Sequence, residues 1–167
     1  MKTYVRGFIA ASLFLLAAAN LRASDIPACG TAPLAQGTWR VSSRFGMRLH
    51  PLDEIWRMHW GVDLASARGT PVTAVGDGVV VFAGRWGCYG KVVVLKHPGD
   101  VATLYAHLSQ VKVRRGWRVR QGDVIGKVGA TGCVTGNHLH FELWKGQRRV
   151  NPLVRCAALR AAEVKKS

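Results

Sequence analysis

Short apolar runs separated by glycine, proline and aspartate dominate the chain from Thr38 onward. Runs rich in valine, leucine and aromatic residues, bounded by turn-forming residues, are typical of β-strands. They predict strands at Pro71–Val75, Gly78–Ala83, Val92–His97, Val101–His107, Val124–Val128 and His138–Trp144. The tripeptides Gly76-Asp77-Gly78 and Pro98-Gly99-Asp100 have the composition of hairpin turns.

No sustained helical period with caps precedes residue 153. The pattern therefore predicts an all-β, compact, antiparallel fold, a sheet or sandwich, with a short helix in the tail Leu153–Ser167. Residues 24–37 are rich in turn formers and are expected to form a leader segment. We assign 38–153 to the folded domain and 154–167 to a basic C-terminal tail.

The N-terminus has the pattern of a secretory signal peptide, assigned to residues 1–23. Lys2 and Arg6 precede an apolar stretch, Phe8–Ala19, that is short for a bilayer-spanning helix. Cleavage after Ala19 or after Ala23 fits the small residues there. An uncleaved anchor, or a lipoprotein processed at Ile26-Pro27-Ala28-Cys29, are the alternatives. Export to the periplasm or the medium is expected, without stable membrane insertion after cleavage.

Four cysteines in an exported chain predict two disulfides. A four-cysteine zinc ribbon is not expected because the chain has no C-x-x-C pair. Cys88 and Cys133 lie in glycine-rich stretches inside the domain, whereas Cys29 and Cys156 lie near its two ends. We therefore expect the pairs Cys88–Cys133 and Cys29–Cys156 among the three connectivities that are open.

The composition gives one ordinary domain with a strong positive charge. The chain has 167 residues, 49% of them hydrophobic, and a formal charge of +15, so a wholly disordered basic chain is excluded. Basic residues interleave with tryptophans late in the chain, at Arg114, Arg115, Trp117, Arg118, Arg120, Trp144, Arg148, Arg149, Lys165 and Lys166. For an exported protein this charge favours the anionic cell envelope as partner over a specific nucleic acid; a solvated charged face is the simpler alternative.

The segment His138-Leu139-His140 carries the first candidate chemistry. Residues two apart in a strand point to the same face, so both imidazoles are expected in one site while Leu139 and Phe141 face the core. Imidazole is a strong zinc ligand. Either both histidines bind one metal ion, or one binds it while the other transfers protons.

A second candidate is His59-Trp60-Gly61-Val62-Asp63, which we expect to be a bent extended segment. A His–Asp pair with one further histidine gives three ligands and leaves the fourth position of zinc to water, the catalytic pattern. His107 ends another predicted strand and can point into the same cleft. His50 and His97 precede prolines and are assigned structural roles, with His97 expected to be solvated.

A series of motifs in this order identifies a family resemblance. It runs through Ser43-Arg44-Phe45-Gly46-Met47-Arg48, His59-x-Gly61-x-Asp63, Gly76-Asp77-Gly78, Tyr89-Gly90, Leu104-Tyr105-Ala106-His107, Gly129-x-Thr131-Gly132, His138-Leu139-His140-Phe141-Glu142 and Asn151-Pro152. Over about Ser42–Pro152 the chain resembles the lysostaphin-type (LytM-like) zinc metallopeptidases, which cleave peptide bonds in bacterial peptidoglycan.

The resemblance implies one Zn²⁺ per chain, bound by His59, Asp63 and His140, with His107 and His138 as catalytic histidines. Glu142 either orients His140 or forms a surface salt bridge. The implied activity is hydrolysis of peptidoglycan cross-links, at a D-alanyl–diaminopimelyl bond or a glycine bridge, by a monomer. The alternative is a non-catalytic wall-binding or amidase-activating module of the same fold.

Overall fold

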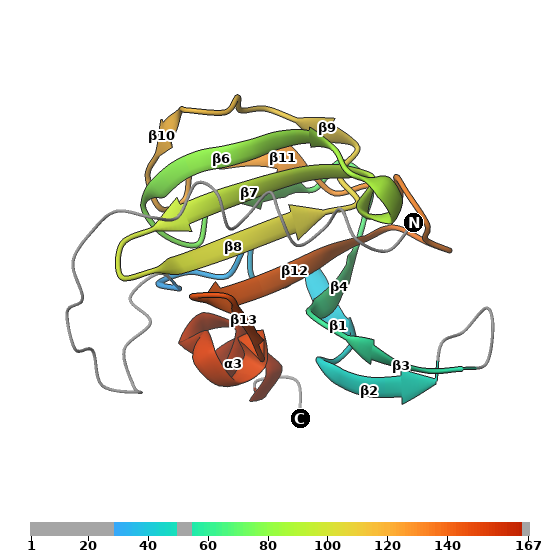
Figure 1. Cartoon of the computed structure of the whole chain (residues 1–167). Coiled ribbons are helices and arrows are strands. Elements are labelled where there is room, and N and C mark those ends of the chain that lie inside the picture. Colours follow the sequence, from blue (N-terminus) through green and yellow to red (C-terminus); the bar gives the residue numbers. More distant parts are fainter. Residues whose placement is uncertain (1–28, 50–54, 165–167) are drawn as a thin grey trace.

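The computed structural model describes residues 29–49 and 55–164, and its strands pair antiparallel throughout that part of the chain (Figure 1). The predicted all-β fold is confirmed. The main sheet has the order β1-β4-β12-β8-β7-β6-β10, with β13 paired to β12. Its strands are β1 (Trp39–Ser43), β4 (Val62–Ser66), β6 (Gly78–Arg85), β7 (Lys91–His97), β8 (Val101–Ala106), β10 (Arg118–Val119), β12 (His138–Lys145) and β13 (Arg148–Val150).

Two smaller sheets accompany the main one. The first has the order β5-β11-β9, and the second is the ribbon β2-β3, which projects from the body in Figure 1. Their strands are β5 (Pro71–Thr73), β11 (Val124–Lys127), β9 (Gln110–Val111), β2 (Gly46–Leu49) and β3 (Trp56–His59). The helical elements are η1 (Gly87–Tyr89), α2 (Pro152–Arg155) and α3 (Ala157–Val164).

The six strands predicted from the apolar runs lie within two residues of β5, β6, β7, β8, β11 and β12. The hairpin at Pro98-Gly99-Asp100 is also confirmed, because it joins the paired strands β7 and β8. Gly99 and Asp100 there have φ of 71° and 58°, the left-handed backbone that tight hairpin turns require.

The predicted hairpin at Gly76-Asp77-Gly78 is wrong. The strand before it, β5, pairs with β11, and the strand after it, β6, pairs with β7 and β10. The tripeptide therefore carries the chain from one sheet to another. Turn composition does not distinguish such a corner from a hairpin.

The main core lies between one face of the large sheet and the β5-β11-β9 sheet. Residues such as Leu64, Leu139 and Phe141 face it, together with Val72 and Ile125 from the smaller sheet. The opposite face of β12 carries His138, His140 and Glu142, as alternation along a strand requires. The candidate site is therefore built on the sheet face that turns away from the main core.

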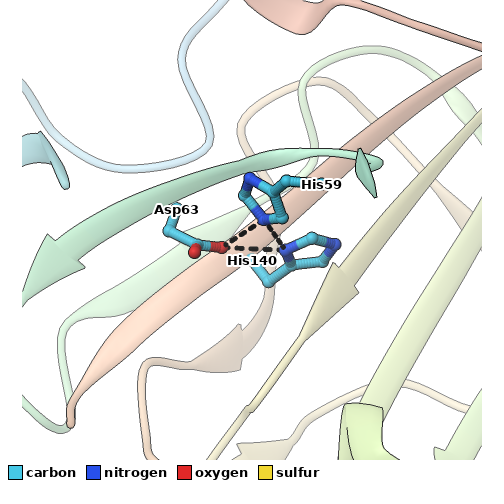
Figure 2. A group of neighbouring side chains, drawn as sticks. All are labelled: His59, Asp63 and His140. Carbon is cyan, nitrogen blue, oxygen red and sulfur yellow. Dashed lines mark hydrogen bonds and ion pairs between the residues drawn. The ribbon is translucent and has the colours of Figure 1, made fainter. Parts of the chain in front are cut away.

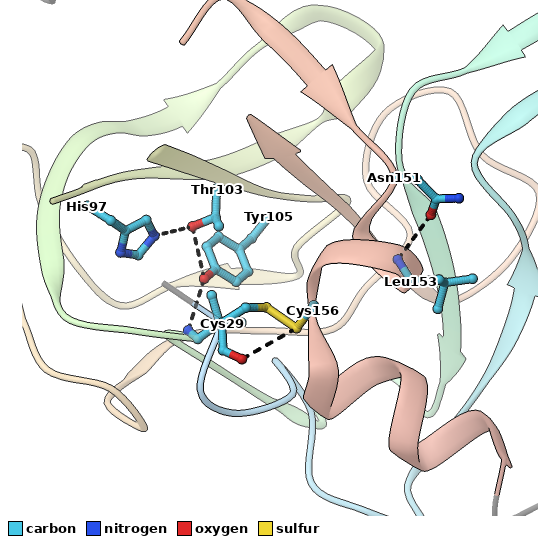
Figure 3. Close-up of a disulfide and its surroundings, with 8 residues drawn as sticks. Cys29, His97, Thr103, Tyr105, Asn151, Leu153 and Cys156 are labelled. Atoms are coloured by element: carbon cyan, nitrogen blue, oxygen red, sulfur yellow. Dashed lines mark hydrogen bonds between the residues drawn. A yellow bond between two sulfur atoms is a disulfide. The ribbon is translucent and has the colours of Figure 1, made fainter. Parts of the chain in front are cut away.

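The two ends of the described chain pack against this core. Leu34 precedes β1, Leu159 lies in α3, and both belong to the core cluster. The structure pairs the four cysteines as the sequence predicted: Cys29 with Cys156, shown in Figure 3, and Cys88 with Cys133. Asn151 caps α2, since its Oδ1 accepts the Leu153 N–H at 3.0 Å.

Several expectations fall outside the described residues: the signal peptide 1–23, the first part of the leader, His50 and the last three residues of the tail. In the remaining parts of the chain, 29–49 and 55–164, none of the helices has the length and apolar character needed to cross a bilayer.

The expectation that His97 is solvated is wrong, because only 3% of the residue is exposed. The Asp77 carbonyl, 2.7 Å from Nδ1, only accepts, so Nδ1 carries the proton and Nε2 accepts from the Thr103 hydroxyl at 2.8 Å. The Thr103 and Tyr105 hydroxyls share a further hydrogen bond, drawn in Figure 3. Burial lowers the pKa of His97 below its usual value, which keeps this chain of hydrogen bonds neutral.

We expect His97→Gln to destabilise the fold by about 1–3 kcal/mol at pH 7.5, because it disturbs a buried hydrogen-bond chain. The deficit should shrink as the pH falls. Below about pH 6.5 the unfolded wild-type chain takes up a proton at His97 that the folded chain refuses, so wild-type stability falls with pH. Urea unfolding from pH 5 to 8 measures both effects, with the exposed Arg85→Gln as control. A deficit that is independent of pH would contradict this account.

Candidate metal centre

The register between β4 and β12 brings the first two candidate ligands together. Asp63 pairs with His140 across the two strands, and the flanking pair Leu64 and Leu139 faces the main core. Because directly opposed residues share a face, the carboxylate and the imidazole lie side by side on the other face. Figure 2 shows the two side chains converging with that of His59.

His59 reaches the same point through a tight bend at Gly61. β3 ends at His59 and β4 begins at Val62, so the expected bent extended segment is confirmed. A Cβ on Gly61 would lie 2.5 Å from the Phe141 carbonyl oxygen and 2.8 Å from Cε1 of His140. Only glycine therefore lets the segment that bears His59 approach β12 this closely.

Three ligand atoms form a compact triangle. His59 Nε2 is 3.1 Å from Asp63 Oδ1, His140 Nδ1 is 2.8 Å from the same oxygen, and the two ring nitrogens are 3.1 Å apart. Ligands at tetrahedral angles around a zinc ion, with bonds of the usual length, would lie about 3.3 Å apart. The three residues are 6–9% exposed, and they form a group that could hold a metal ion.

The outer nitrogens of both imidazoles are already occupied. His59 Nδ1 donates to the Arg44 carbonyl at 2.8 Å, and His140 Nε2 donates to Glu142 Oε1 at 3.1 Å. The lone pairs of His59 Nε2 and His140 Nδ1 are then left facing each other and the Asp63 carboxylate. Three converging electron-pair donors repel one another unless a positive charge lies among them, so this donor set fits a cation.

The pKa shifts of His140 and Asp63 also indicate that the triangle favours a positive charge. Burial opposes the charged form of His140, but hydrogen bonds to Asp63 and Glu142 outweigh it and raise its pKa to about 9. Burial also acts to raise the pKa of Asp63, yet hydrogen bonds from His140 and His59 hold it well below its usual value. In the absence of a metal ion, a proton on His140 supplies the charge that the triangle requires.

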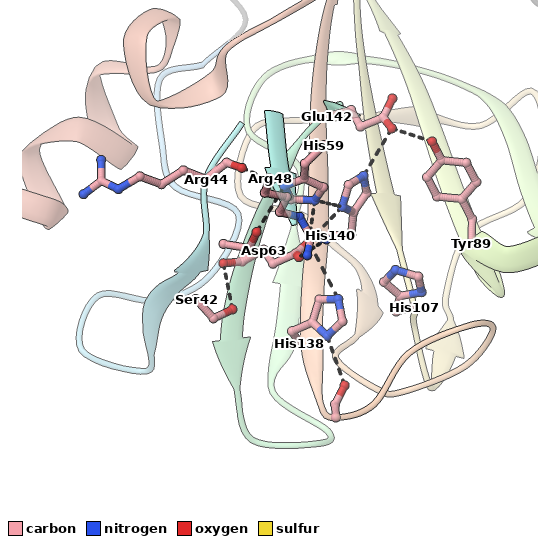
Figure 4. Close-up of polar contacts among 12 residues, drawn as sticks. Ser42, Arg44, Arg48, His59, Asp63, Tyr89, His107, His138, His140 and Glu142 are labelled. Atoms are coloured by element: carbon pink, nitrogen blue, oxygen red, sulfur yellow. Dashed lines mark hydrogen bonds and ion pairs between the residues drawn. The ribbon is translucent and has the colours of Figure 1, made fainter. Parts of the chain in front are cut away.

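His138 and His107 lie beside the triangle, as Figure 4 shows. His138 Nδ1 donates to the Gly136 carbonyl at 3.0 Å, and its Nε2 lies 3.7 Å from Asp63 Oδ1. His107 Nδ1 donates to the Thr131 carbonyl at 2.9 Å, and its ring centre is 4.8 Å from that of His138. In both residues the backbone bond fixes the proton on Nδ1, so Nε2 keeps a lone pair.

His107 has two unusual properties for a histidine. Its φ of 61° lies in the left-handed region, which costs energy for a residue with a Cβ. Burial lowers its pKa to about 4, so the ring is neutral at physiological pH. Strained backbone and a shifted pKa at one residue of a cleft are features of functional sites.

Glu142 is fully buried, which excludes the surface salt bridge considered for it from the sequence. Its Oε1 accepts from His140 Nε2, so it lies where a carboxylate orients that imidazole. Three further side chains that the sequence did not point to donate to this carboxylate: Tyr89, Arg149 and Trp144, whose Nε1 lies 2.8 Å from Oε2. The Tyr89 hydroxyl donates to Oε1 at 2.6 Å and Arg149 Nε donates to Oε2 at 2.9 Å. Tyr89 was visible only as part of a motif, and Arg149 only as one of many basic residues.

A profile of Peptidase family M23 matches residues 57–152, and the chain belongs to this family. A DD-carboxypeptidase/endopeptidase Mpg of Neisseria meningitidis is 51% identical over 114 residues, 68% of this chain and 26% of that protein. The peptidoglycan DD-endopeptidase ShyA of Vibrio cholerae is 45% identical over 116 residues, 69% of this chain and 27% of that protein. This chain thus spans about a quarter of the length of these relatives.

Solved structures agree with the sequence comparison. The catalytic domain of the antimicrobial peptidase lysostaphin from Staphylococcus simulans superposes with a TM-score of 0.64 and 30% identity, covering 70% of this chain and 90% of that one. A zinc-containing peptidase from Vibrio cholerae superposes with a TM-score of 0.67 and 35% identity, over 71% and 37% of the two chains. The resemblance to lysostaphin-type peptidases is therefore confirmed.

We expect Gly61→Ala to weaken metal binding, because the added Cβ must push His59 away from β12. Competition with a chelator, using Zn²⁺ as the probe, should show a loss of at least tenfold, the scale on which disturbed ligand geometry acts. Gly136→Ala is the matched control, since its Cβ would meet nothing within 4 Å. Equal affinities in the two variants would show that the close approach at Gly61 does not position the ligands.

Proposed function

We propose that this chain is a zinc-dependent endopeptidase that hydrolyses peptide cross-links of bacterial peptidoglycan. The convergence of His59 Nε2, Asp63 Oδ1 and His140 Nδ1 on one point is the observation that carries the proposal. Two imidazoles and one carboxylate are the ligand types of catalytic zinc, which keeps a fourth position open. The relatives named as peptidoglycan DD-endopeptidases support the substrate class, and their names favour a D-alanyl–diaminopimelyl bond over a glycine bridge.

In this proposal His59, Asp63 and His140 hold the zinc ion. When bound, zinc acidifies water and polarises the scissile carbonyl. Asp63 Oδ1 lies within 3.1 Å of both ligand nitrogens, and its carboxylate offsets part of the metal charge. Glu142 holds His140 with Nδ1 turned toward the other ligands.

His138 and His107 supply proton transfer. Their Nδ1 protons are committed to backbone carbonyls, so each ring accepts a proton at Nε2. The low pKa of His107 keeps its Nε2 unprotonated at neutral pH. Once protonated at Nε2, either ring can donate a hydrogen bond to the oxygen of the tetrahedral intermediate and then transfer that one proton to the leaving amine.

The alternative function is a wall-binding or amidase-activating module without catalysis. The convergence of His59, Asp63 and His140, with His107 and His138 beside them (Figure 4), argues against it, because a module that only binds the wall has no need of a converging set of metal-ligand donors. The relatives that are named as endopeptidases argue in the same direction.

We further propose that the protein acts outside the cytoplasm, in the periplasm or after secretion, as a monomer. Two disulfides and relatives that act on peptidoglycan support export. The signal peptide 1–23, the leader 24–37, the peptidase domain 38–153 and the tail 154–167 are the proposed division of the chain. Its positive charge is proposed to hold the protein near the anionic envelope.

Substitutions distinguish a proposed zinc ligand, His140, from a proposed proton-transfer residue, His138. His140→Ala should remove bound zinc and nearly all release of muropeptides from purified sacculi. His138→Ala should keep one zinc per chain and lose about 10²–10⁴-fold in rate, the usual contribution of a general acid–base group. Zinc content by atomic absorption and muropeptides by mass spectrometry measure the two effects.

Two results would contradict this assignment. Wild-type protein that binds zinc yet releases no fragment would favour the non-catalytic module. A His140→Ala protein that retains both zinc and lytic activity would exclude His140 as a ligand. His97→Gln is the control substitution for both measurements, because His97 hydrogen-bonds to Asp77 and Thr103 on the core side of the fold and not at the candidate metal centre.

The Cys88–Cys133 disulfide should matter for turnover rather than for metal binding. It joins the two segments that hold His107, because the Tyr89 carbonyl accepts the His107 N–H and the Thr131 carbonyl accepts its Nδ1–H, both at 2.9 Å. Replacing both cysteines by serine should lower kcat by about 10²-fold if His107 shifts by 1 Å. The zinc affinity should fall much less than kcat, since these segments carry no proposed ligand and Tyr89 on one of them contacts Glu142, the partner of His140.

The other disulfide provides the control for this experiment. Cys29 and Cys156 belong to the main core, on the sheet face opposite the candidate site, and their double serine variant should lower the Tm while leaving kcat intact. If removal of Cys88–Cys133 likewise lowers only the Tm, the disulfide does not position His107.

A further inference from the structure

Arg149 occupies an unusual position for one of 24 basic residues in this chain. It lies on β13, and its guanidinium carbon is 4.2 Å from the centre of the Trp144 ring and 5.3 Å from that of Trp60. Its Nε donates to Glu142 Oε2 at 2.9 Å. The guanidinium is thus held by two aromatic faces and by one buried carboxylate.

The Glu142 carboxylate is hydrogen-bonded at both of its oxygens. Trp144 Nε1 donates to Oε2 at 2.8 Å, beside Arg149. The Tyr89 hydroxyl and His140 Nε2 both donate to Oε1. Four donors from four side chains hold a carboxylate with 0% exposure.

Trp60 links this network to the other ligand-bearing segment. It lies between His59 and Gly61, in the bend that brings His59 to the triangle. Its ring packs edge-on against Phe45 at 6.2 Å and is approached by Arg149 from the β13 side. Arg149 therefore contacts β12 through Glu142 and Trp144, and contacts the bend between β3 and β4 through Trp60.

We propose that Arg149 is a positioning residue of the metal centre: it fixes the Glu142 carboxylate that orients His140 and clamps the bend that carries His59. This inference rests on the proposed zinc site and adds a determinant of its affinity. The physical reason is the entropy of metal binding. If His140 and the bend that carries His59 were mobile, ordering them on binding would cost free energy, whereas Arg149 holds both in place before the metal binds. Arginine suits the position because its planar group stacks on indoles and donates at the same time.

Lysine would not replace this arginine fully. An ammonium group could pair with Glu142, but it has no planar face to stack between Trp144 and Trp60. Loss of Arg149 would remove one of the two donors to Oε2 and the cation that pairs with the buried carboxylate, so Glu142 would hold His140 Nε2 less firmly. Outer partners of this kind typically contribute 10–100-fold to metal affinity.

The test is the Zn²⁺ affinity of the purified full chain, measured by competition with a chelator. We expect Arg149→Gln to bind zinc 10–100-fold more weakly and Arg149→Lys to fall between it and the wild type. Arg148→Gln is the matched control, because this neighbour is exposed and its change removes the same charge. Arg148→Gln should bind zinc as the wild type does.

A second variant covers the case in which Arg149→Gln folds poorly. Trp60→Leu removes one stacking partner at a residue that is 43% exposed, and should weaken zinc binding about two- to fivefold, the scale of one cation–π contact. That loss should shrink when Arg149 is already Lys, since an ammonium group has no planar face to stack on the Trp60 ring. Equal losses in both backgrounds would contradict the clamp.

Unfolding of the metal-free protein separates positioning from mere support of the fold. If Arg149 only stabilises the fold, Arg149→Gln lowers the stability of metal-free and zinc-bound protein equally and leaves the zinc affinity within twofold of the wild type. That outcome overturns the inference and leaves the proposed function standing. A wild-type chain that binds no zinc would instead refute the proposed function itself.

Discussion

The register between β4 and β12 is the constraint on which the rest of the site depends. It places Asp63 opposite His140 on one face and Leu64 opposite Leu139 on the other. A slip by one residue would turn the proposed ligands into the apolar core and the leucines out of it, so the burial of the core selects the register that assembles the candidate site. Apolar packing on the opposite face of the same strands therefore supplies the free energy that holds Asp63 and His140 in position.

The charges around His140 determine which kind of ion the triangle can bind. His140 lies between two buried carboxylates, Asp63 at Nδ1 and Glu142 at Nε2. Such an arrangement stabilises positive charge at one nitrogen and fixes the proton at the other. Arg149 forms an ion pair with Glu142 and offsets its negative charge. The Asp63 carboxylate instead faces the two ring nitrogens of the triangle, so its negative charge acts there. Two carboxylates of similar burial thus have different roles because their partners differ.

The sequence predicted those features that depend on local alternation. The two-residue spacing of His138 and His140 correctly implied a shared face, and Gly61, with no helical pattern around it, correctly implied a bent extended segment between His59 and Asp63. Contacts between distant elements were not predictable in the same way. The corner at Gly76-Asp77-Gly78 has the composition of a hairpin, and the burial of His97 depends on Asp77 from that corner and Thr103 from β8. Nor does any local pattern place Arg149 against Glu142.

Two kinds of structural element hold the residues of the site: paired strands and loops. His59, Asp63 and His140 lie on or beside paired strands, where neighbouring hydrogen bonds leave little room for displacement. His107 follows the end of β8 in a strained left-handed conformation, and its contacts come from loop carbonyls of Tyr89 and Thr131. Metal ligation tolerates little error in distance, whereas a proton-transfer group must also meet a substrate that enters and leaves. A sheet suits the first requirement, and a loop pair closed by a disulfide suits the second because it limits motion without burying the ring in the core.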